Sequence, residues 1–417
     1  MTKKSDAPAI RFKGFSDAWE QRKLEDYLTV SAEKNTGNIY GRSDVLSVSG
    51  DYGIVNQIEF QGRSFAGASV SNYGVVQTGD VVYTKSPLNS NPYGIIKTNK
   101  GKPGIVSTLY AVYHPKENAF SDFIQVYFEQ HARMNNYMHP LVNKGAKNDM
   151  KVSAENALKG PVCFPSRIEQ ESISAFFSVL DNLITLHQRK FEKLTNVKKS
   201  MLEKMFPQNG SSYPEIRFKG FTDPWEQRKF SELVQIERGG SPRPIDDFIT
   251  DAPNGLNWVK IGDAPTQGNY ITKTAEKIRP EGLSKTREVH PGDLILSNSM
   301  SFGKPYIMGI DGCIHDGWLL IRNTYGVFDL TFLCHLLGTP QMLSQYRSLA
   351  AGSTVNNLNK ELVGNTYVTI PSITEQRVLG AYLEQLDNLI TLHQRKPFLM
   401  KWRTSDANRN KTNRLVL

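Results

Sequence analysis

The sequence predicts an α+β protein with two mixed α/β domains, two long antiparallel helices and a pseudo-twofold internal repeat. Two repeated runs predict this arrangement. LDNLITLHQRK occupies positions 180–190 and returns unchanged at 386–396, while IRFKGFSDAWEQRK at 10–23 is answered by IRFKGFTDPWEQRK at 216–229. Both pairs are displaced by 206 residues, and the segments between them, roughly 30–160 and 235–366, share almost no identity. The chain is therefore expected to be an internal duplication that holds two different inserts.

The repeats also set the expected domain boundaries, because the motif PSxxEQ recurs at the same offset before each closing run. We expect an N-terminal domain at 1–165, a first helical region at 166–210, a second domain at 211–371, a second helix at 372–396 and an atypical, frayed tail at 397–417.

Composition fits a globular protein of two or three cores. The chain has 417 residues, 39% hydrophobic content and a net charge of +9, and the positive charge suits a polyanionic partner such as nucleic acid. No run of about 18 apolar residues occurs, so a cytoplasmic protein without a membrane span is expected. The three cysteines, Cys163, Cys313 and Cys334, form no CxxC pair and are expected to be buried thiols.

Both closing blocks carry a heptad pattern, in which apolar residues recur at alternating steps of four and three. Two equivalent seams in one chain favour an intramolecular antiparallel coiled coil. The first helix should end at Phe206 and Pro207, after about 35 residues or roughly 50 Å. The residues expected to pair are Ile173, Phe177, Leu180, Ile184 and His187 in the first copy and Leu379, Leu383, Leu386, Ile390 and His393 in the second.

His187 and His393 occupy matched seam positions, where a polar residue can fix the register of a coiled coil. A metal or proton-relay role is the alternative. It is disfavoured because no other His, Cys or paired carboxylate recurs beside them at helical spacing.

The two closing blocks diverge at Pro397, which stands where the first copy has Phe191. Proline removes a helical hydrogen bond and clashes with the preceding turn, so the second helix should end near Lys396. The polar tail beyond it resembles an altered or out-of-frame ending.

Each insert contains strand-like runs bounded by turn residues. The clearest are GDVVYTKS at 79–86 and GDLILSNS at 292–299, and YGIIKTNKGKPGIV and FGKPYIMGIDGCI should add further strands. A helix is expected near the end of each insert, at 123–139 and at 332–349.

The loops beside these strands are rich in residues that hydrogen-bond to base edges and phosphates. Arg and Lys can pair with guanine, and Asn with adenine, although such residues are also common in any loop. The first insert offers Lys85, Asn89, Asn91, Lys97, Lys100, Lys144 and Lys147, and the second offers Arg238, Ser241, Arg243, Lys260, Asn298, Ser299, Lys304, Asn356 and Asn357.

Catalytic motifs are missing from the sequence. Asn91-Pro92-Tyr93 lacks the second proline of the NPPY signature of amino-methyltransferases, and the run at 65–68 lacks the second glycine of a cofactor loop. There is no P-loop, no GxSxG and no HExxH. We therefore expect no enzymatic activity, no metal site and no cofactor in this chain.

The chain closely resembles the specificity subunit of a type I restriction-modification enzyme. The likeness covers nearly the whole chain to Lys396, and it rests on the repeated RFKGFxDxWEQRK, on GDLILSNS followed by FGKPYIM, on GSTVNNLNKEL at 352–362, and on PSxxEQ before LDNLITLHQRK. The resemblance implies two target-recognition domains that each read half of a split DNA site, held apart by conserved helices.

The resemblance also implies partners. Two methyltransferase subunits that bind S-adenosylmethionine would dock on the repeated regions, and restriction subunits that use ATP and Mg²⁺ would join through them. Because the inserts differ, the two half-sites of the double-stranded DNA should differ as well. The altered tail after Lys396 should weaken binding of the second methyltransferase subunit. Two other functions stay open, a self-sufficient DNA methyltransferase and a repeat scaffold that does not bind DNA.

Overall fold

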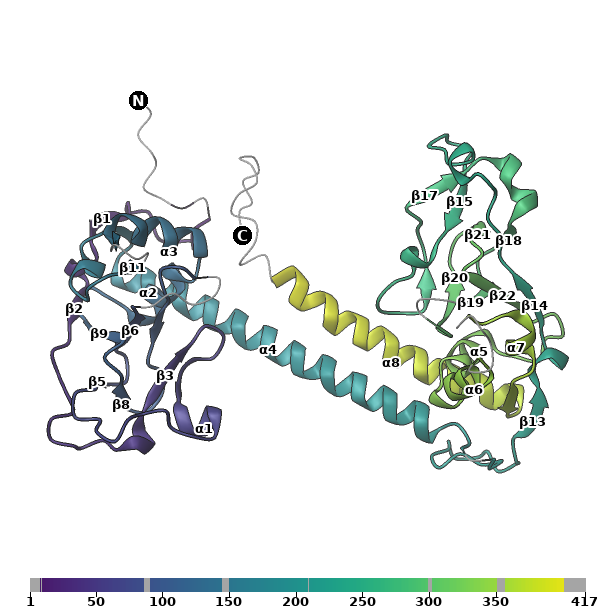
Figure 1. Cartoon of the computed structure of the whole chain (residues 1–417), viewed down its shortest axis with the longest axis horizontal. Coiled ribbons are helices and arrows are strands. Elements are labelled where there is room, and N and C mark those ends of the chain that lie inside the picture. The colour runs from purple at the N-terminus through teal and green to yellow at the C-terminus, as the bar shows by residue number, and fades with distance from the viewer. Residues whose placement is uncertain are drawn as a thin grey trace. The chain divides into compact units, whose positions relative to one another are not determined.

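The computed structural model of the chain describes residues 8, 10–85, 91–144, 150–208, 210–298, 302–350 and 357–400. Contacts within the chain define two compact units, drawn in Figure 1, and each is considered by itself. Unit 1 spans 1–184 with 400–417, and unit 2 spans 185–399. None of the helices in the described ranges is both long and apolar enough to cross a lipid bilayer.

A four-stranded antiparallel sheet forms the centre of unit 1. Its order is β2-β9-β6-β7, and these strands span Leu28–Val30, Tyr110–Pro115, Val81–Thr84 and Ile96–Thr98. Strand β6 is the GDVVYTKS run, and Gly79 turns the chain into it with a φ of 91°, which residues with a Cβ rarely adopt. All four residues of β6 are buried, as expected for an aliphatic strand covered on both faces.

Shorter strand pairs complete unit 1. β3 pairs with β4, β5 pairs with β8, and β10 pairs with β11, while a parallel bridge between Val45 and Ile105 joins the first two pairs. The Asn56 side chain caps α1 (Gln57–Gln61) by accepting from two backbone N–H groups. The six strands span Leu46–Ser49, Gly53–Asn56, Gly74–Val76, Gly104–Val106, Asn143–Lys144 and Met150–Lys151.

Unit 2 contains a five-stranded and a four-stranded sheet. The first has the order β14-β22-β19-β20-β16, with strands Gln235–Arg238, Trp318–Arg322, Leu294–Ser297, Pro305–Met308 and Tyr270–Ile271. The second has the order β17-β15-β21-β18, with strands Glu276–Ile278, Leu256–Val259, Gly312–Ile314 and Arg287–Val289.

The two inserts share one topology although their sequences differ. The order β14-β22-β19-β20 in unit 2 matches β2-β9-β6-β7 in unit 1. In the second sheet, β21 pairs in parallel with β15 and antiparallel with β18, just as β8 bridges in parallel to Val45 beside β3 and pairs antiparallel with β5. The prediction of one α+β domain for each insert is confirmed.

The helix expected near the end of each insert is two helices in both units. They are α2 (Ser121–Phe128) and α3 (His131–Met138) in unit 1, and α5 (Leu330–Leu337) and α6 (Pro340–Ala350) in unit 2. In unit 2 the first helix ends at Gly338. The Thr339 hydroxyl accepts from the Met342 N–H at 3.3 Å and caps α6. The expectation of a single helix was wrong because the apolar period continues across the break. A short helix, α7 (Lys360–Gly364), follows, capped by Asn359.

The repeated motifs build the same fastening in each unit, which we call the arginine clamp. In unit 1 the Arg11 guanidinium donates to both carboxylate oxygens of Glu169 at 2.7 Å, and Trp19 Nε1 donates to Glu169 at 3.4 Å. Unit 2 repeats it with Arg217, Glu375 and Trp225, at 2.8, 2.8 and 3.3 Å.

Strand pairs and a glutamine extend each clamp. β1 (Glu20–Lys23) pairs with β12 (Pro161–Phe164), and β13 (Glu226–Lys229) pairs with β23 (Tyr367–Ile370). Gln170 accepts from the Phe120 N–H before α2 at 2.9 Å, and Gln376 accepts from the Asp329 N–H before α5 at 3.0 Å. The duplicated residues thus attach each insert to the start of a long helix.

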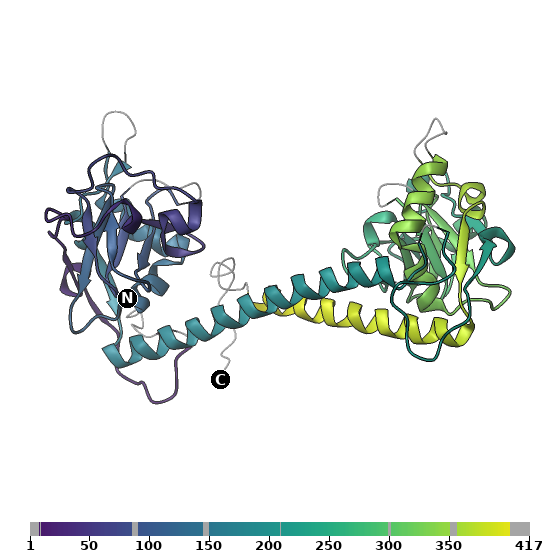
Figure 2. The same ribbon diagram turned by 90° about the horizontal axis from the view of Figure 1, so that it is seen from below.

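The long helices are α4 (Arg167–Lys204) and α8 (Ile373–Met400). From Thr185 onward α4 belongs to unit 2, where it lies antiparallel beside α8 in both views (Figures 1 and 2). His187 Nδ1 lies 2.8 Å from His393 Nδ1, and Lys198 Nζ forms an ion pair with Asp387 further along. One imidazole must donate while the other accepts, so the two histidines pair with each other across the seam.

The structure gives a different neighbour to two of the seam residues. Ile173 packs against the core of unit 1, and Phe177 lines a groove of that unit together with Trp19. The heptad pattern located their buried face correctly but not the surface that covers it. Leu180 and Ile184 are half-buried, and Leu379, Leu383, Leu386 and Ile390 are all buried in unit 2.

Helix α8 also runs four residues past Lys396, to Met400. The expected stop before Pro397 was wrong, because a proline costs one hydrogen bond and can kink a helix without ending it.

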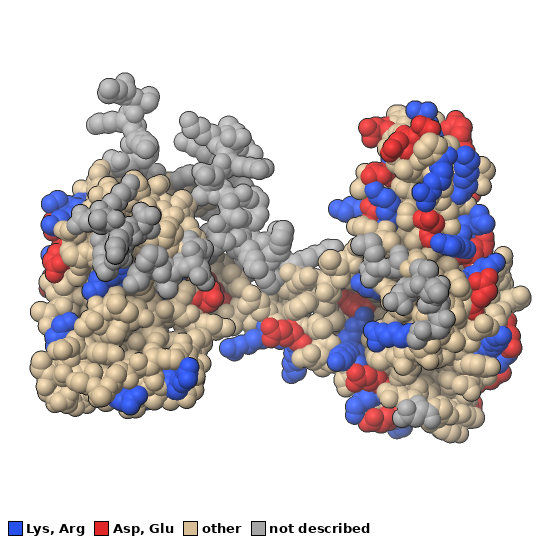
Figure 3. Space-filling view, viewed as in Figure 1, with Lys and Arg blue, Asp and Glu red and all other residues tan. Residues whose placement is uncertain are grey.

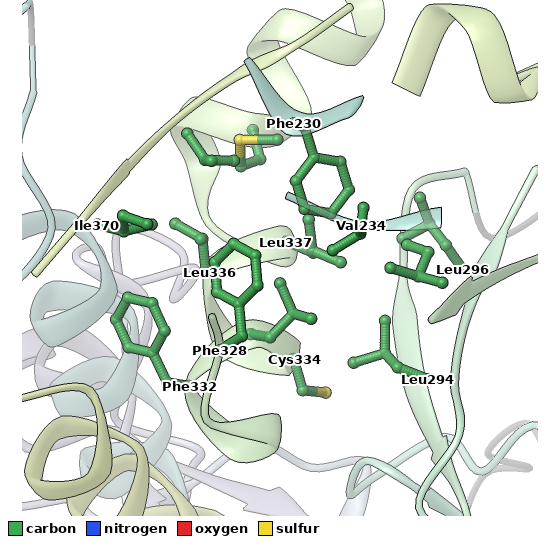
Figure 4. Packing of buried hydrophobic residues seen from close by; sticks show 14 of the residues in the cluster. Phe230, Val234, Leu294, Leu296, Phe328, Phe332, Cys334, Leu336, Leu337 and Ile370 are labelled. Carbon is green, nitrogen blue, oxygen red and sulfur yellow. The ribbon is translucent and has the colours of Figure 1, made fainter. Parts of the chain in front are cut away.

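The largest core lies in unit 2 and contains residues of the sheet, of α5 and of both long helices. Figure 4 shows Phe332 and Leu336 of α5 beside Phe328 and Phe230, with Leu294 and Leu296 of β19 to one side. Met205 and Phe206, just after α4, belong to the same cluster and are 4% and 3% exposed. Of the cysteines, Cys313 and Cys334 are buried and Cys163 is half-buried.

Candidate nucleic-acid interface

Matched strand ends carry different polar groups in the two units. β6 in unit 1 and β19 in unit 2 hold the same place in their sheets, and each follows a Gly-Asp turn. Lys85 comes directly after β6, and Asn298 comes directly after β19. One topology therefore presents an ammonium group at this position in unit 1 and an amide in unit 2.

In unit 2 four predicted residues converge on Asp316, in the turn between β21 and β22. The Ser241 hydroxyl donates to Asp316 Oδ1 at 3.0 Å, and Arg243 Nη2 lies 3.7 Å from Oδ2. Asn298 Nδ2 donates to the Asp316 carbonyl at 2.8 Å, and Arg238 Nε donates to the same carbonyl at 3.5 Å. We call this group, with His315, the Asp316 cluster.

Two glycines allow the loop after β14 to reach this turn. A Cβ on Gly239 would lie 2.2 Å from the His315 carbonyl oxygen, and one on Gly240 would lie 2.4 Å from the Lys285 carbonyl oxygen. The loop 239–243 can approach so closely only because both positions lack a side chain. His315 Nε2 lies 2.9 Å from Asp316 Oδ1, and His315 Nδ1 accepts a hydrogen bond from the Gly317 N–H.

The cluster offers donors and an acceptor at one exposed spot. The Arg243 side chain is 79% exposed, and its ion pair with Asp316 is long at 3.7 Å, so its guanidinium can turn to another partner. Arginine can pair with the O6 and N7 of guanine, and a carboxylate can accept from the amino group of cytosine. These groups suit the reading of a base edge.

Asn298 is placed differently from the expectation. It is 3% exposed, and its amide holds the Asp316 turn. Its expected role as a direct DNA contact is corrected to a positioning role, since a buried amide that already holds its partner does not reach a base.

Other predicted residues of unit 2 lie outside the cluster. Lys260 forms an ion pair with Glu276, Lys304 Nζ lies 4.8 Å from the centre of the Tyr306 ring, and Asn357 is exposed. Ser299 and Asn356 fall outside the described residues.

In unit 1 Lys85 remains the strongest candidate. It is half-buried, and burial followed by the nearby charge of Lys34 lowers the pKa of its ammonium group. The carboxylate of Glu155 opposes this shift. Two lysines that repel each other form a favourable place for a phosphate or a base acceptor.

Lys97 corrects a second expectation. It is 7% exposed and pairs with Glu129 at 3.3 Å, so it stabilises the domain and does not face a ligand. Lys100 is exposed but pairs with Asp122 at 3.1 Å, and the Asn91 carbonyl closes a turn by accepting from the Gly94 N–H. Asn89, Lys147 and the side chain of Lys144 fall outside the described residues.

The sequence search missed Lys34, Glu155, His315 and Asp316. Only donors to phosphate and base edges beside the clearest strands were selected, so the acidic Glu155 and Asp316 were passed over, and Lys34 lies too far along the chain from those strands. The signal in the sequence is weak, a single aspartate in the run IHDGW. On the face drawn in Figure 3, unit 2 interleaves basic and acidic side chains, and no broad patch of one sign covers it.

A chain that repeats one domain topology, with unlike polar groups at matched strand ends, has the organisation of a two-site recognition protein. Comparison with known proteins shows what the chain is similar to. Residues 222–398 match the model of the type I restriction modification DNA specificity domain.

Two relatives from Methanocaldococcus jannaschii are type I restriction enzyme specificity subunits. The MjaVIII subunit is 24% identical over 309 residues, which cover 71% of this chain and 70% of the relative. The putative MjaX subunit is 21% identical over 396 residues, with 91% and 89% covered. The S subunit structure from M. genitalium covers 95% of this chain and 96% of its own, with a TM-score of 0.57 at 10% identity, which shows a shared fold. The resemblance to type I restriction-modification specificity subunits is confirmed.

Proposed function

We propose that this chain is the DNA-recognition subunit of a type I restriction-modification complex and has no catalytic role of its own. Unit 1 would read one half of a split target, and unit 2 would read the other. The observation that carries the proposal is the contrast at matched strand ends, with Lys85 beside Lys34 in unit 1 and the Asp316 cluster in unit 2. Unlike groups at equivalent places would select unlike half-sites, so the target would be asymmetric.

The repeated frame would serve the partners. Two clamps with the same residues offer equivalent surfaces, which suit two copies of one methyltransferase subunit. These subunits would hold S-adenosylmethionine, and restriction subunits that use ATP and Mg²⁺ would join through them. The antiparallel contact of α4 and α8 would set the spacer between half-sites.

A domain exchange tests the proposal. Residues 235–366 are replaced by the corresponding insert of a relative with another target, and methylated adenines are mapped in cells that also make the methyltransferase subunit. One half-site should change while the other stays the same, and exchange of 30–160 should change only the other half. An unchanged target after both exchanges would contradict the proposal.

Point variants locate the reading groups. Arg243→Ala should weaken binding to the specific duplex by roughly 1–3 kcal/mol and relax one position of the target. Arg228→Ala is the matched control, because Arg228 is exposed on the frame and pairs with Glu226 and Glu232. Equal losses for the two variants would remove the Asp316 cluster from the reading surface.

The other two functions give different results in the same assays. A self-sufficient methyltransferase would modify DNA without a partner subunit. A scaffold would show no binding to a defined duplex, and therefore no dependence of binding on salt.

A further inference from the structure

An apolar groove of about 520 Å³ lies beside the arginine clamp of unit 1. Its lining includes Ile10, Phe12, Trp19, Phe123, Phe176 and Phe177. Ile10 is 64% exposed, Phe12 is 39% exposed and Phe176 is 44% exposed. Large apolar side chains that gather at one exposed place mark an interaction site.

Unit 2 contains the equivalent groove, and there its tryptophan and leucine are covered. Trp225 takes the place of Trp19, and Leu383 takes the place of Phe177, at the repeat offset. Phe332 takes the place of Phe123, since each lies three residues after the N–H that donates to the motif glutamine. Trp225 is 2% exposed and Leu383 is 0% exposed, whereas Trp19 and Phe177 are only half-buried; Phe332 and its counterpart Phe123 are buried in both units.

Met205 and Phe206, from the end of the first closing block, cover the groove of unit 2. The Phe206 ring stacks on Phe332 at a centroid distance of 5.7 Å and meets Trp225 edge-on at 6.0 Å. The Ile216 N–H donates to the Lys204 carbonyl at 2.9 Å and so fixes the end of the helix against the opening block. The duplicated chain thus shows what covers this groove in unit 2.

The second closing block does not carry that methionine–phenylalanine pair in its sequence. At the repeat offset, Met205 and Phe206 correspond to Lys411 and Thr412. Lys411 and Thr412 carry no large apolar side chain, so they are a poor match for an apolar groove. The Met205 and Phe206 of another copy of this chain are already buried in its own unit 2.

We propose that the unit 1 groove docks the methionine–phenylalanine end of a closing helix from a second, different polypeptide. That partner would carry the pattern SMLEKMF found here at 200–206. Its phenylalanine would pack against Trp19, and its last helical carbonyl would face the backbone of Ile10. This inference concerns assembly and does not depend on the reading of DNA by either unit.

The test uses the full chain and a fluorescein-labelled peptide with the sequence of residues 190–207, followed by fluorescence anisotropy. Saturable binding is expected. Replacing the methionine and phenylalanine that correspond to Met205 and Phe206 by serine should weaken it at least about tenfold. Phe176→Glu in the chain should weaken peptide binding by a similar factor. If the Phe176→Glu variant does not fold, Ile10→Glu replaces it in the test. Val179→Glu is the control, because Val179 is 56% exposed on the same helix and does not line the groove.

Four results would overturn the proposal. The first is the absence of saturable binding, and the second is equal binding of the serine peptide. The third is displacement by a peptide of residues 401–417 as effective as by unlabelled 190–207, which would assign the groove to the chain's own tail. The fourth is a dimer that the chain forms on its own in analytical sedimentation and that Phe176→Glu abolishes. Such a dimer would assign the groove to a second copy of the chain.

Discussion

Replacing Arg217 with methionine should lower the free energy of unfolding of unit 2 by about 3–5 kcal/mol, the usual cost of leaving a buried carboxylate without its partner. The Glu375 side chain is 4% exposed and the Arg217 side chain 14% exposed, and both guanidinium contacts are 2.8 Å long. Methionine keeps much of the volume of arginine, so the loss comes from the unpaired charge and not from a cavity.

A second substitution separates the charge from the packing. In the Arg217→Met background, Glu375→Leu should restore at least half of the lost stability, because it removes the unpaired charge. A deficit of about 1 kcal/mol should remain, because the Trp225 N–H, 2% exposed, would lose its acceptor. Arg11→Met should destabilise unit 1 in the same way, since its clamp has the same geometry.

Urea unfolding of the full chain, followed by tryptophan fluorescence and by circular dichroism, measures these changes. Arg228→Ala is the control and should have little effect, since its two ion pairs are solvent-exposed. A loss below about 1 kcal/mol for Arg217→Met, or no recovery in the double variant, would refute the reasoning that a buried charge holds the frame.

Three further predictions concern unit 2. Burial lowers the pKa of His335 to about 4, so the unfolded state binds a proton more readily than the folded state. The free energy of unfolding should therefore fall by roughly 3 kcal/mol as the pH drops from about 6.5 to 4. His335→Leu should remove this dependence in acid titrations followed by circular dichroism. Gly239→Ala should abolish specific duplex binding, because its Cβ has no space beside a backbone carbonyl, whereas Gly262→Ala, with open space around it, should bind normally in the same anisotropy assay. Phe206→Ala should cost about 3–5 kcal/mol in urea unfolding, and Phe176→Ala, 44% exposed, should cost much less.

The sequence was sufficient for the frame and for the central strands. An aliphatic run after a Gly-Asp turn predicts a strand because the turn and the side chains both act locally, and β6 and β19 lie where that rule places them. The duplication could be recognised from the sequence because each clamp needs an arginine, a tryptophan and a glutamate, and these residues recur at the same offset in both units.

Tertiary neighbours explain most of what the sequence did not give. Periodicity shows which face of a helix is buried, but not against what, and Ile173 therefore faces its own domain core in place of the second helix. An asparagine after a strand has the same composition signal whether it reads a base or holds a turn. Only the 3% exposure of Asn298 and its bond to the Asp316 carbonyl distinguish the two roles.

Placing the strong interactions in the frame has a consequence for how targets can change. The clamp, the helix pair and the aliphatic strands hold each insert without any contribution from exposed reading groups such as the Arg243 side chain. Such exposed groups can therefore vary at little cost in folding stability. The Asp316 cluster qualifies this freedom. Because its turn is held by the buried Asn298 and by the absence of a side chain at Gly239, a new specificity in unit 2 requires the loop and the turn to change together.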